Sequence, residues 1–243
     1  MASSLPVPKH HDIFAVIFTL LFPASLTLVY FTLLADAPAA TQYLAYGSLK
    51  LIQFGFPLFW VLTIQRRRLR LHAPESTGLL AGVTFGAAVL AAMWALYSYV
   101  LEPSGLMEAV RAPVRDKIVG FGVDTLAAYV AMAVSYSFIH SLLEEYYWRW
   151  FVFAQLRRRA RLATAIFISS VGFMAHHVIV VGSFFGWVSP LGWFLAVAVA
   201  LGGVVWAWMY HRWGSLYPVW FGHLLVDAGI FWVGYDLIGG LPS

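Results

Sequence analysis

Seven apolar segments, each long enough to cross a lipid bilayer, constrain the fold of this chain more than any other feature. A spanning helix needs about 20 predominantly apolar residues. The segments lie near residues 13–34, 43–64, 78–101, 125–154, 162–185, 189–210 and 216–236. Only 11% of the residues are charged, against about 25% in a soluble domain. The sequence therefore predicts an all-α, polytopic membrane protein with about seven transmembrane helices.

We expect these helices to form one transmembrane domain over residues 1–243. The sequence shows no internal repeat, low-complexity stretch or linker, and its length leaves no room for a large soluble domain. Residues 1–11 lack a small-residue cleavage site, so the first apolar segment is expected to be a retained helix rather than a signal peptide. The absence of cysteine excludes disulfides, catalytic thiolates and Cys-ligated metals.

Arginine clusters at the ends of apolar segments predict the orientation of the chain, because cytoplasmic loops carry an excess of Lys and Arg. If the N-terminus, with Lys9, is cytoplasmic, then loops 65–77, 155–161 and 211–215 share its side. These loops hold Arg66, Arg67, Arg68, Arg70, Arg157, Arg158, Arg159, Arg161 and Arg212, whereas the opposite side holds Arg111, Arg115 and Lys117. The asymmetry predicts a cytoplasmic N-terminus, in the cell membrane if the host is prokaryotic.

The net charge of +4 is explained by these clusters. Because they directly follow apolar segments, we interpret them as membrane-orienting charge, and we expect no nucleic-acid partner. The three cations of the opposite side lie in loop 102–124, which is mixed in charge. We expect this loop to be partly helical at the membrane interface.

Two adjacent carboxylates, Glu144 and Glu145, lie with Arg149 inside the fourth apolar segment. Charge near the bilayer interior is costly, so an ionisable residue there is a functional-site hypothesis by default. Residues four apart share a helical face, which predicts an ion pair between Glu145 and Arg149. Glu144 points about 100° away and is a candidate general base. A structural salt bridge at a helix end is the alternative interpretation, although it explains the second glutamate poorly.

Histidines add polar groups to the fourth, fifth and seventh segments. His176 and His177 are adjacent in the fifth, about 100° apart, so we expect only one of them to face a shared cavity. His223 and Asp227 are four apart in the seventh, where they could orient a histidine tautomer, stabilise an oxyanion or contribute to a metal site. His140, one turn before the glutamates, is expected to pack or to support the site.

These residues form three motifs in one order: Glu144-Glu145-x-x-x-Arg149, Phe173-x-x-x-His177 and His223-x-x-x-Asp227. The set resembles the CPBP family, which includes type II CAAX prenyl proteases and bacterial Abi-type intramembrane proteins. The resemblance covers about residues 140–230, inside a motif-bearing part at about 125–236. Each motif alone is short, but three in order on three apolar segments are fairly specific.

The resemblance implies a helical-bundle intramembrane endopeptidase, similar to a CAAX prenyl protease. By the family's pattern, Glu144 and His177 activate a water for attack on a peptide carbonyl. The pair of Glu145 with Arg149 holds the architecture. His223 and residue 227 stabilise the tetrahedral oxyanion.

Two departures from a simple match affect the expected roles. The first is that position 227 is Asp, which the family's pattern allows beside Asn. An ionised Asp227 only accepts hydrogen bonds, so it stabilises an oxyanion only when protonated and otherwise orients His223. A shift of one residue in the alignment would exchange the roles of His176 and His177. The position of Phe173 favours His177.

The sequence leaves the cofactor and the substrate open. Glu144, His177 and His223 could supply three zinc ligands, and a glutamate-activated water without metal is equally consistent. The His-Glu-x-x-His motif of other intramembrane metalloproteases is absent. The expected partners are the lipid bilayer and a peptide or membrane-protein substrate, prenylated or not.

A non-catalytic membrane protein is the competing hypothesis. A transporter, immunity factor or scaffold could use the same buried polar groups for structure or proton movement. Other membrane functions fit less well, because the last segment has no lysine for a retinal Schiff base and no Gly-x-Ser-Gly run is present. The aspartyl-type near match at residues 233–236 lacks its second glycine.

Overall fold

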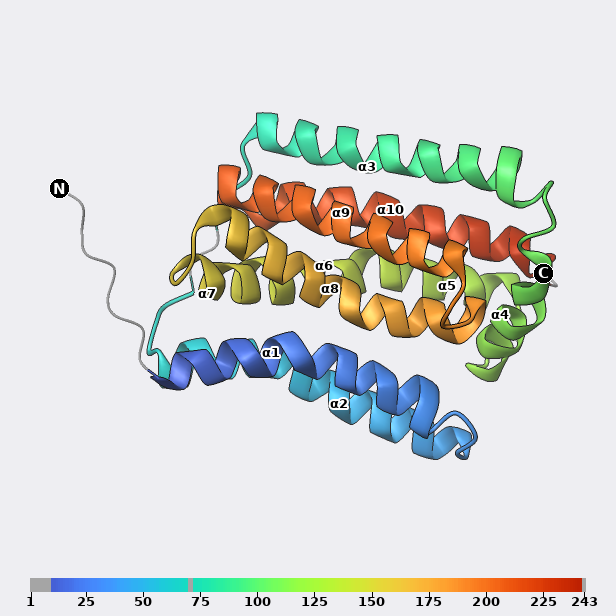
Figure 1. Cartoon of the computed structure of the whole chain (residues 1–243), viewed down its shortest axis with the longest axis horizontal. Coiled ribbons are helices and arrows are strands. Elements are labelled where there is room, and N and C mark those ends of the chain that lie inside the picture. Colours follow the sequence, from blue (N-terminus) through green and yellow to red (C-terminus); the bar gives the residue numbers. More distant parts are fainter. Residues whose placement is uncertain (1–9, 70–71, 242–243) are drawn as a thin grey trace. The chain divides into compact units, whose positions relative to one another are not determined.

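The structure, a computed structural model, describes residues 10–69 and 72–241, and every element in these two ranges is helical. The α-helices are α1 (His10–Leu28), α2 (Ala39–Phe59), α3 (Ser76–Leu96), α4 (Glu108–Gly120), α5 (Leu126–Ser135), α6 (Ser141–Glu145), α7 (Ala154–Arg157), α8 (Leu162–Phe185), α9 (Pro190–Trp213) and α10 (Leu216–Leu237) (Figure 1). Five π-helical segments continue or join them: η1 (Val29–Leu33), η2 (Trp60–Ile64), η3 (Tyr97–Leu101), η4 (Tyr136–His140) and η5 (Tyr146–Phe153). The predicted all-α class is confirmed.

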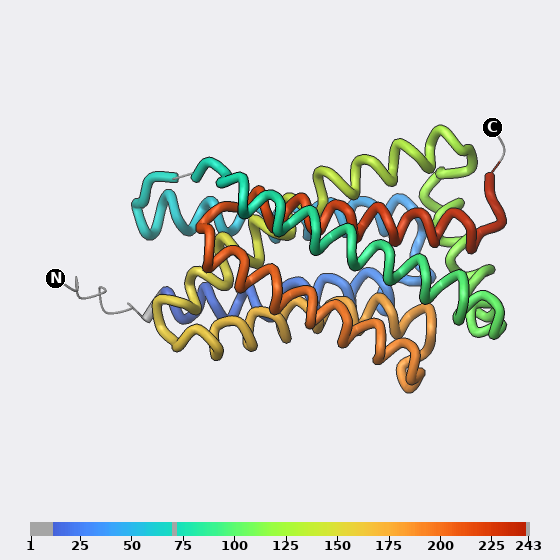
Figure 2. The backbone as a smooth tube through the Cα atoms, turned by 90° about the horizontal axis from the view of Figure 1, so that it is seen from above, coloured from blue at the N-terminus to red at the C-terminus, as the bar shows by residue number. Residues whose placement is uncertain are grey.

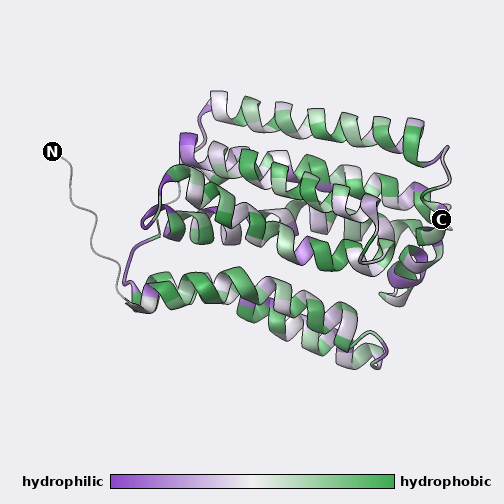
Figure 3. Cartoon of the chain, in the orientation of Figure 1, coloured by the Kyte–Doolittle hydropathy of each residue, from purple (hydrophilic) through white to green (hydrophobic). Residues whose placement is uncertain are grey.

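Seven candidate membrane spans occur among the described residues. They are Asp12–Leu33, Ala39–Ile64, Ser76–Leu101, Leu126–Arg157, Leu162–Phe185, Pro190–Trp213 and Leu216–Leu237. Apolar residues follow the lengths of these helices, and hydrophilic residues gather at helix ends and in loops (Figure 3). The predicted spans are confirmed, and the chain fits an integral multi-pass membrane protein. Its orientation stays a prediction, for which Lys9 and Arg70 lie outside the described residues.

Two compact units make up the chain. The first unit comprises Met1–Leu71 and Tyr146–His211, and the second comprises His72–Glu145 and Arg212–Ser243. The span Leu126–Arg157 contributes residues to both. The expectation of a single domain stays a prediction, and each unit is described by itself.

In the first unit, α1 packs against α8 and runs beside α2 (Figure 1). Tyr147 is fully buried, and its hydroxyl donates to the carbonyl of Thr19 at 2.8 Å. Gly172 of α8 allows its neighbours to approach closely. A Cβ at this position would lie 2.8 Å from the side chain of Leu20 and 2.9 Å from that of Trp148, which is too close. Aromatic packing and a small residue at the crossing therefore hold these helices together.

In the second unit, α3 and α10 cross at close range, as Figure 2 shows for the teal-to-green and red tubes. Three glycines of α3, Gly78, Gly82 and Gly86, lie on the contact face. A Cβ on Gly82 would come within 1.9 Å of the carbonyl oxygen of Pro218, and one on Gly86 within 2.6 Å of that of Gly222. Small residues at every fourth position let two helix backbones approach closely in a membrane protein. This approach sets the position of α10.

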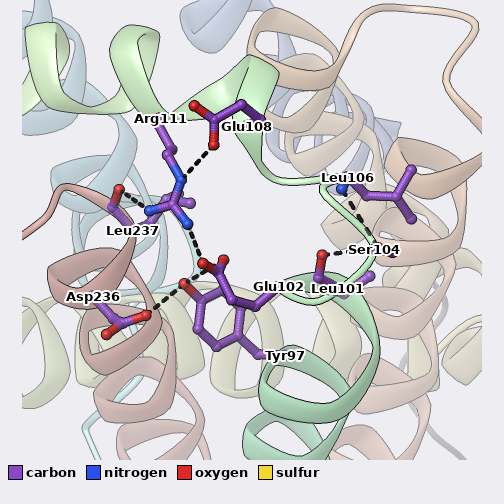
Figure 4. Close-up of polar contacts among 9 residues, drawn as sticks. All are labelled: Tyr97, Leu101, Glu102, Ser104, Leu106, Glu108, Arg111, Asp236 and Leu237. Carbon is purple, nitrogen blue, oxygen red and sulfur yellow. Dashed lines mark hydrogen bonds and ion pairs between the residues drawn. The ribbon is translucent and has the colours of Figure 1, made fainter.

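A polar cluster fixes the C-terminal end of α10 (Figure 4). Arg111 of α4 donates to the carbonyl of Leu237 at 2.9 Å and pairs with Glu102 and Glu108. The hydroxyl of Tyr97 donates to Asp236 at 2.7 Å. Cationic side chains satisfy the last carbonyls of a helix and complement its dipole. The loop predicted to be partly helical thus contains α4, which holds one end of α10.

Candidate active site

His223 of α10 lies among three carboxylates of the second unit. Its Nδ1 is 2.7 Å from Oε1 of Glu145. Its Nε2 is 3.5 Å from Oδ1 of Asp227 and 3.8 Å from Oε2 of Glu144. The contact between α6 and α10 brings the two glutamates to the histidine, and the four-residue spacing along α10 brings Asp227.

Exposure rises from one side of this group to the other. The side chain of Glu145 is 0% exposed, and those of Glu144 and His223 are each 5% exposed. Asp227 reaches 15%, and His140 reaches 24%. Buried carboxylates need hydrogen-bond partners, because an unpaired buried charge is strongly destabilising. Glu145 is thus the anchored member of the group, and Asp227 and His140 are its more accessible members.

Glu144 has an imidazole near each of its carboxylate oxygens. Oε1 is 3.4 Å from Nε2 of His140, one turn earlier in the same span, and Oε2 faces His223. Both contacts are longer than a short charge-assisted hydrogen bond. Such a carboxylate can take up a proton and pass it on, which is the task of a general base.

The fifth-segment histidines lie in the first unit, on α8. Nδ1 of His177 lies 2.9 Å from the carbonyl oxygen of Phe173. A carbonyl only accepts, so Nδ1 carries the proton, and Nε2 of the neutral ring is left as an acceptor. His176 is buried and stacks on Trp148, with ring centroids 5.8 Å apart and planes 4° apart. The two neighbours thus differ in their surroundings.

Arg149 is buried in the first unit between two aromatic rings. Its guanidinium lies 4.7 Å from the centroid of Phe173 and 5.2 Å from that of Trp206. Cation–π contacts of this kind stabilise a desolvated guanidinium. The predicted pairing with Glu145 joins residues of the two units and stays a prediction, as does the position of His177 relative to Glu144.

The sequence did not indicate the contact between Glu145 and His223. Helical spacing relates residues of one helix, whereas this contact joins residues of two spans that lie 78 positions apart in the sequence. Spacing along α10 makes Asp227 a candidate for orienting His223, yet the oxygen at hydrogen-bond distance from Nδ1 belongs to Glu145. Glu145 is therefore an additional candidate for orienting the imidazole.

A comparison with known protein families gives a match over the part of the chain that holds the motif residues. Residues 126–229 match the model described as type II CAAX prenyl endopeptidase Rce1-like. This segment is similar to an Rce1-like domain, and the match is consistent with the CPBP family. The Rce1-like segment contains every motif residue from Glu144 to Asp227 and supports a CAAX-type intramembrane protease family. No curated protein and no solved structure matches the chain.

Proposed function

We propose that this protein is an intramembrane endopeptidase, in which Glu144 and His177 activate the water that attacks a peptide carbonyl. The observation that carries the proposal is the Rce1-like match over the segment that holds both residues. The setting of Glu144, nearly buried and flanked by two imidazoles, supports its role as the base. The neutral tautomer of His177 supports a second acceptor of the water's protons.

His223 serves the oxyanion in this proposal. Glu145 accepts the hydrogen bond of Nδ1–H and fixes the ring. With carboxylates around it, the ring can hold a second proton, and Nε2–H then donates to the negative oxygen of the tetrahedral intermediate. Asp227 accepts from the same Nε2–H while no substrate is bound. Its accepting role agrees with the chemistry of an ionised aspartate.

A metal is compatible with the donors but is not required by them. Glu144, His177 and His223 are the candidate ligands, and zinc would act there as a Lewis acid on the water or the carbonyl. The contact of Glu145 with Nδ1 of His223 is of the kind that orients a histidine ligand. Metal analysis of the purified protein, with cleavage assayed before and after chelation, decides between the two forms of the mechanism. Unchanged cleavage by metal-free protein favours the glutamate-activated water.

The experiment that tests the reaction uses purified protein in lipid nanodiscs and peptides with a C-terminal CAAX sequence. Each peptide is supplied with and without a prenyl group, in water enriched in ¹⁸O. Hydrolysis places one ¹⁸O atom in the new carboxylate of the product, which mass spectrometry detects. Cleavage of the prenylated peptide alone identifies the substrate class, and cleavage of both identifies a broader endopeptidase. Absence of any hydrolysed product from these peptides and from a membrane-protein library contradicts the proposal.

A further inference from the structure

Four membrane spans of the first unit have ends that meet in one polar cluster. Spans Asp12–Leu33 and Leu162–Phe185 begin near it, and spans Ala39–Ile64 and Leu126–Arg157 end near it. The amides of Gln65 and Gln155 exchange hydrogen bonds at 3.2 Å. Asp12 accepts from Gln65 at 2.9 Å and pairs with Arg159 at 3.1 Å. These contacts bring two arginine-rich loops together at the ends of the four spans.

Positive charge far exceeds negative charge at this place. We define the arginine cluster as Arg66, Arg67, Arg68, Arg157, Arg158, Arg159 and Arg161. The first unit contains two acidic residues, Asp12 and Asp36. Asp36 follows the opposite end of the first span, so Asp12 is left as the acidic residue beside the cluster. One carboxylate cannot neutralise seven guanidinium groups.

Three members of the cluster, Arg157, Arg158 and Arg159, are partly buried without full compensation. The Nε atoms of Arg157 and Arg159 are buried and have no hydrogen-bond partner within the described part of the chain. The pKa of Arg158 lies below its ordinary value because burial removes water and because Arg67 and Arg159 are close. Desolvated like charges and unmet donors are costly, so the arrangement favours a bound anion.

The backbone also holds this arrangement at a cost. Arg66 has a φ of 50°, a left-handed conformation that is unfavourable for a residue with a side chain. The turn directs the chain so that the amide of Arg67 donates to the carbonyl of Val61 at 3.0 Å. Arginines that serve only to orient a helix in the membrane need only lie in the loop that follows it. That role requires neither the meeting of two loops nor a strained turn.

We propose that the arginine cluster binds the phosphate of an anionic phospholipid headgroup. Arginine presents a planar set of donors that matches phosphate oxygens two at a time. Basic pockets between transmembrane helices are suited to such headgroups, which lie at the same depth as the ends of the spans. The arginine cluster includes none of the carboxylate and histidine residues of the proposed protease, so this proposal stands or fails independently of that one.

Lipid affinity of the full chain in detergent micelles tests the proposal. Brominated phosphatidylglycerol quenches tryptophan fluorescence and serves as the anionic probe, with brominated phosphatidylcholine as the neutral one. We expect tighter binding of the anionic lipid. Arg67→Gln with Arg158→Gln should weaken it by about 30-fold, the effect of two arginines at an anionic surface. The matched control, Lys117→Gln with Arg212→Gln, removes two charges elsewhere and should keep the affinity.

A charge-retaining variant separates lipid binding from folding. Arg67→Lys with Arg158→Lys keeps both charges and loses the paired donors, so its affinity should lie between those of the wild type and the glutamine variant. Thermal unfolding shows whether each variant is folded. Equal affinity for the two lipids, or equal loss in the glutamine variant and its control, overturns the proposal. If inorganic phosphate alone raises the unfolding temperature as much as the anionic lipid does, the proposal is also overturned, because the site would then bind a free anion.

Discussion

At the scale of single residues, Glu145 and Glu144 have different environments although they are neighbours. Glu145 makes a short contact to Nδ1 of His223, whereas Glu144 lies at longer distances from two imidazoles. A charge-assisted hydrogen bond at 2.7 Å fixes a ring, and a longer contact leaves a carboxylate able to exchange protons. The pair therefore divides into an orienting group and a reacting group.

Replacing Glu145 should impair the orientation of His223. Glu145→Gln keeps an accepting oxygen but loses the charge that favours a protonated ring. Loss of a group that orients a functional histidine typically costs about 10–100-fold in activity, so we expect kcat to fall by about that factor with KM little changed. Steady-state kinetics measures the split. Glu108→Gln, at an exposed carboxylate of α4, is the control, and wild-type kcat in Glu145→Gln contradicts the orienting role.

His177 and His176 should differ in what their loss affects. His177→Ala removes a proposed acceptor of protons and should lower the cleavage rate by about 10²–10⁴-fold. His176→Ala removes a ring stacked on Trp148 and should instead lower the unfolding temperature, with most activity retained. Cleavage rates and thermal unfolding of both variants check this. The reverse pattern would assign the catalytic role to His176.

Sequence spacing indicated part of this site for a simple reason. Contacts within one helix, such as His223 with Asp227 or His140 with Glu144, follow from the four-residue repeat. A contact between helices depends on how they cross and rotate, which spacing along one helix does not specify. The meeting of Glu145 with His223 is such a contact.

At the scale of elements, the sequence predicts the positions of the membrane spans but not how the helices pack against one another. Bilayer thickness requires a minimum apolar length, so hydropathy locates the spans closely. The second span shows the largest difference, beginning at Ala39 rather than near residue 43. The sequence does not indicate the glycine face of α3, because glycines are frequent in membrane helices and apolar residues surround them.

Substitution at this glycine face should separate α3 from α10. Gly82→Ala places a methyl group where the carbonyl oxygen of Pro218 lies, and a backbone atom cannot move aside cheaply. Overpacking typically costs about 1–3 kcal/mol, so the unfolding temperature and the cleavage rate should both fall. Gly47→Ala, on α2 with nothing near its added methyl, should not lower stability. Equal effects of the two substitutions contradict the close crossing.

At the scale of the whole molecule, the placement of charge predicts how the protein lies in the membrane. The chain has no cysteine, so a single introduced thiol reports on one position without background. Ala73→Cys tests loop 65–77, and Ser104→Cys tests loop 102–124; both positions are exposed. With a cytoplasmic N-terminus, an impermeant maleimide should label Ser104→Cys in intact cells and Ala73→Cys only after lysis. Labelling of Ala73→Cys in intact cells contradicts that orientation.

The central claim, that Glu144 is the base of a proteolytic reaction, is tested most directly by single-turnover cleavage. Wild-type protein, Glu144→Gln and the control Glu108→Gln are compared in identical nanodiscs, with a substrate cleaved by the wild type. Thermal unfolding shows whether each protein is folded. We predict that folded Glu144→Gln loses about 10²–10⁴-fold in the rate of the chemical step, whereas Glu108→Gln cleaves normally. Wild-type cleavage by Glu144→Gln would contradict the account.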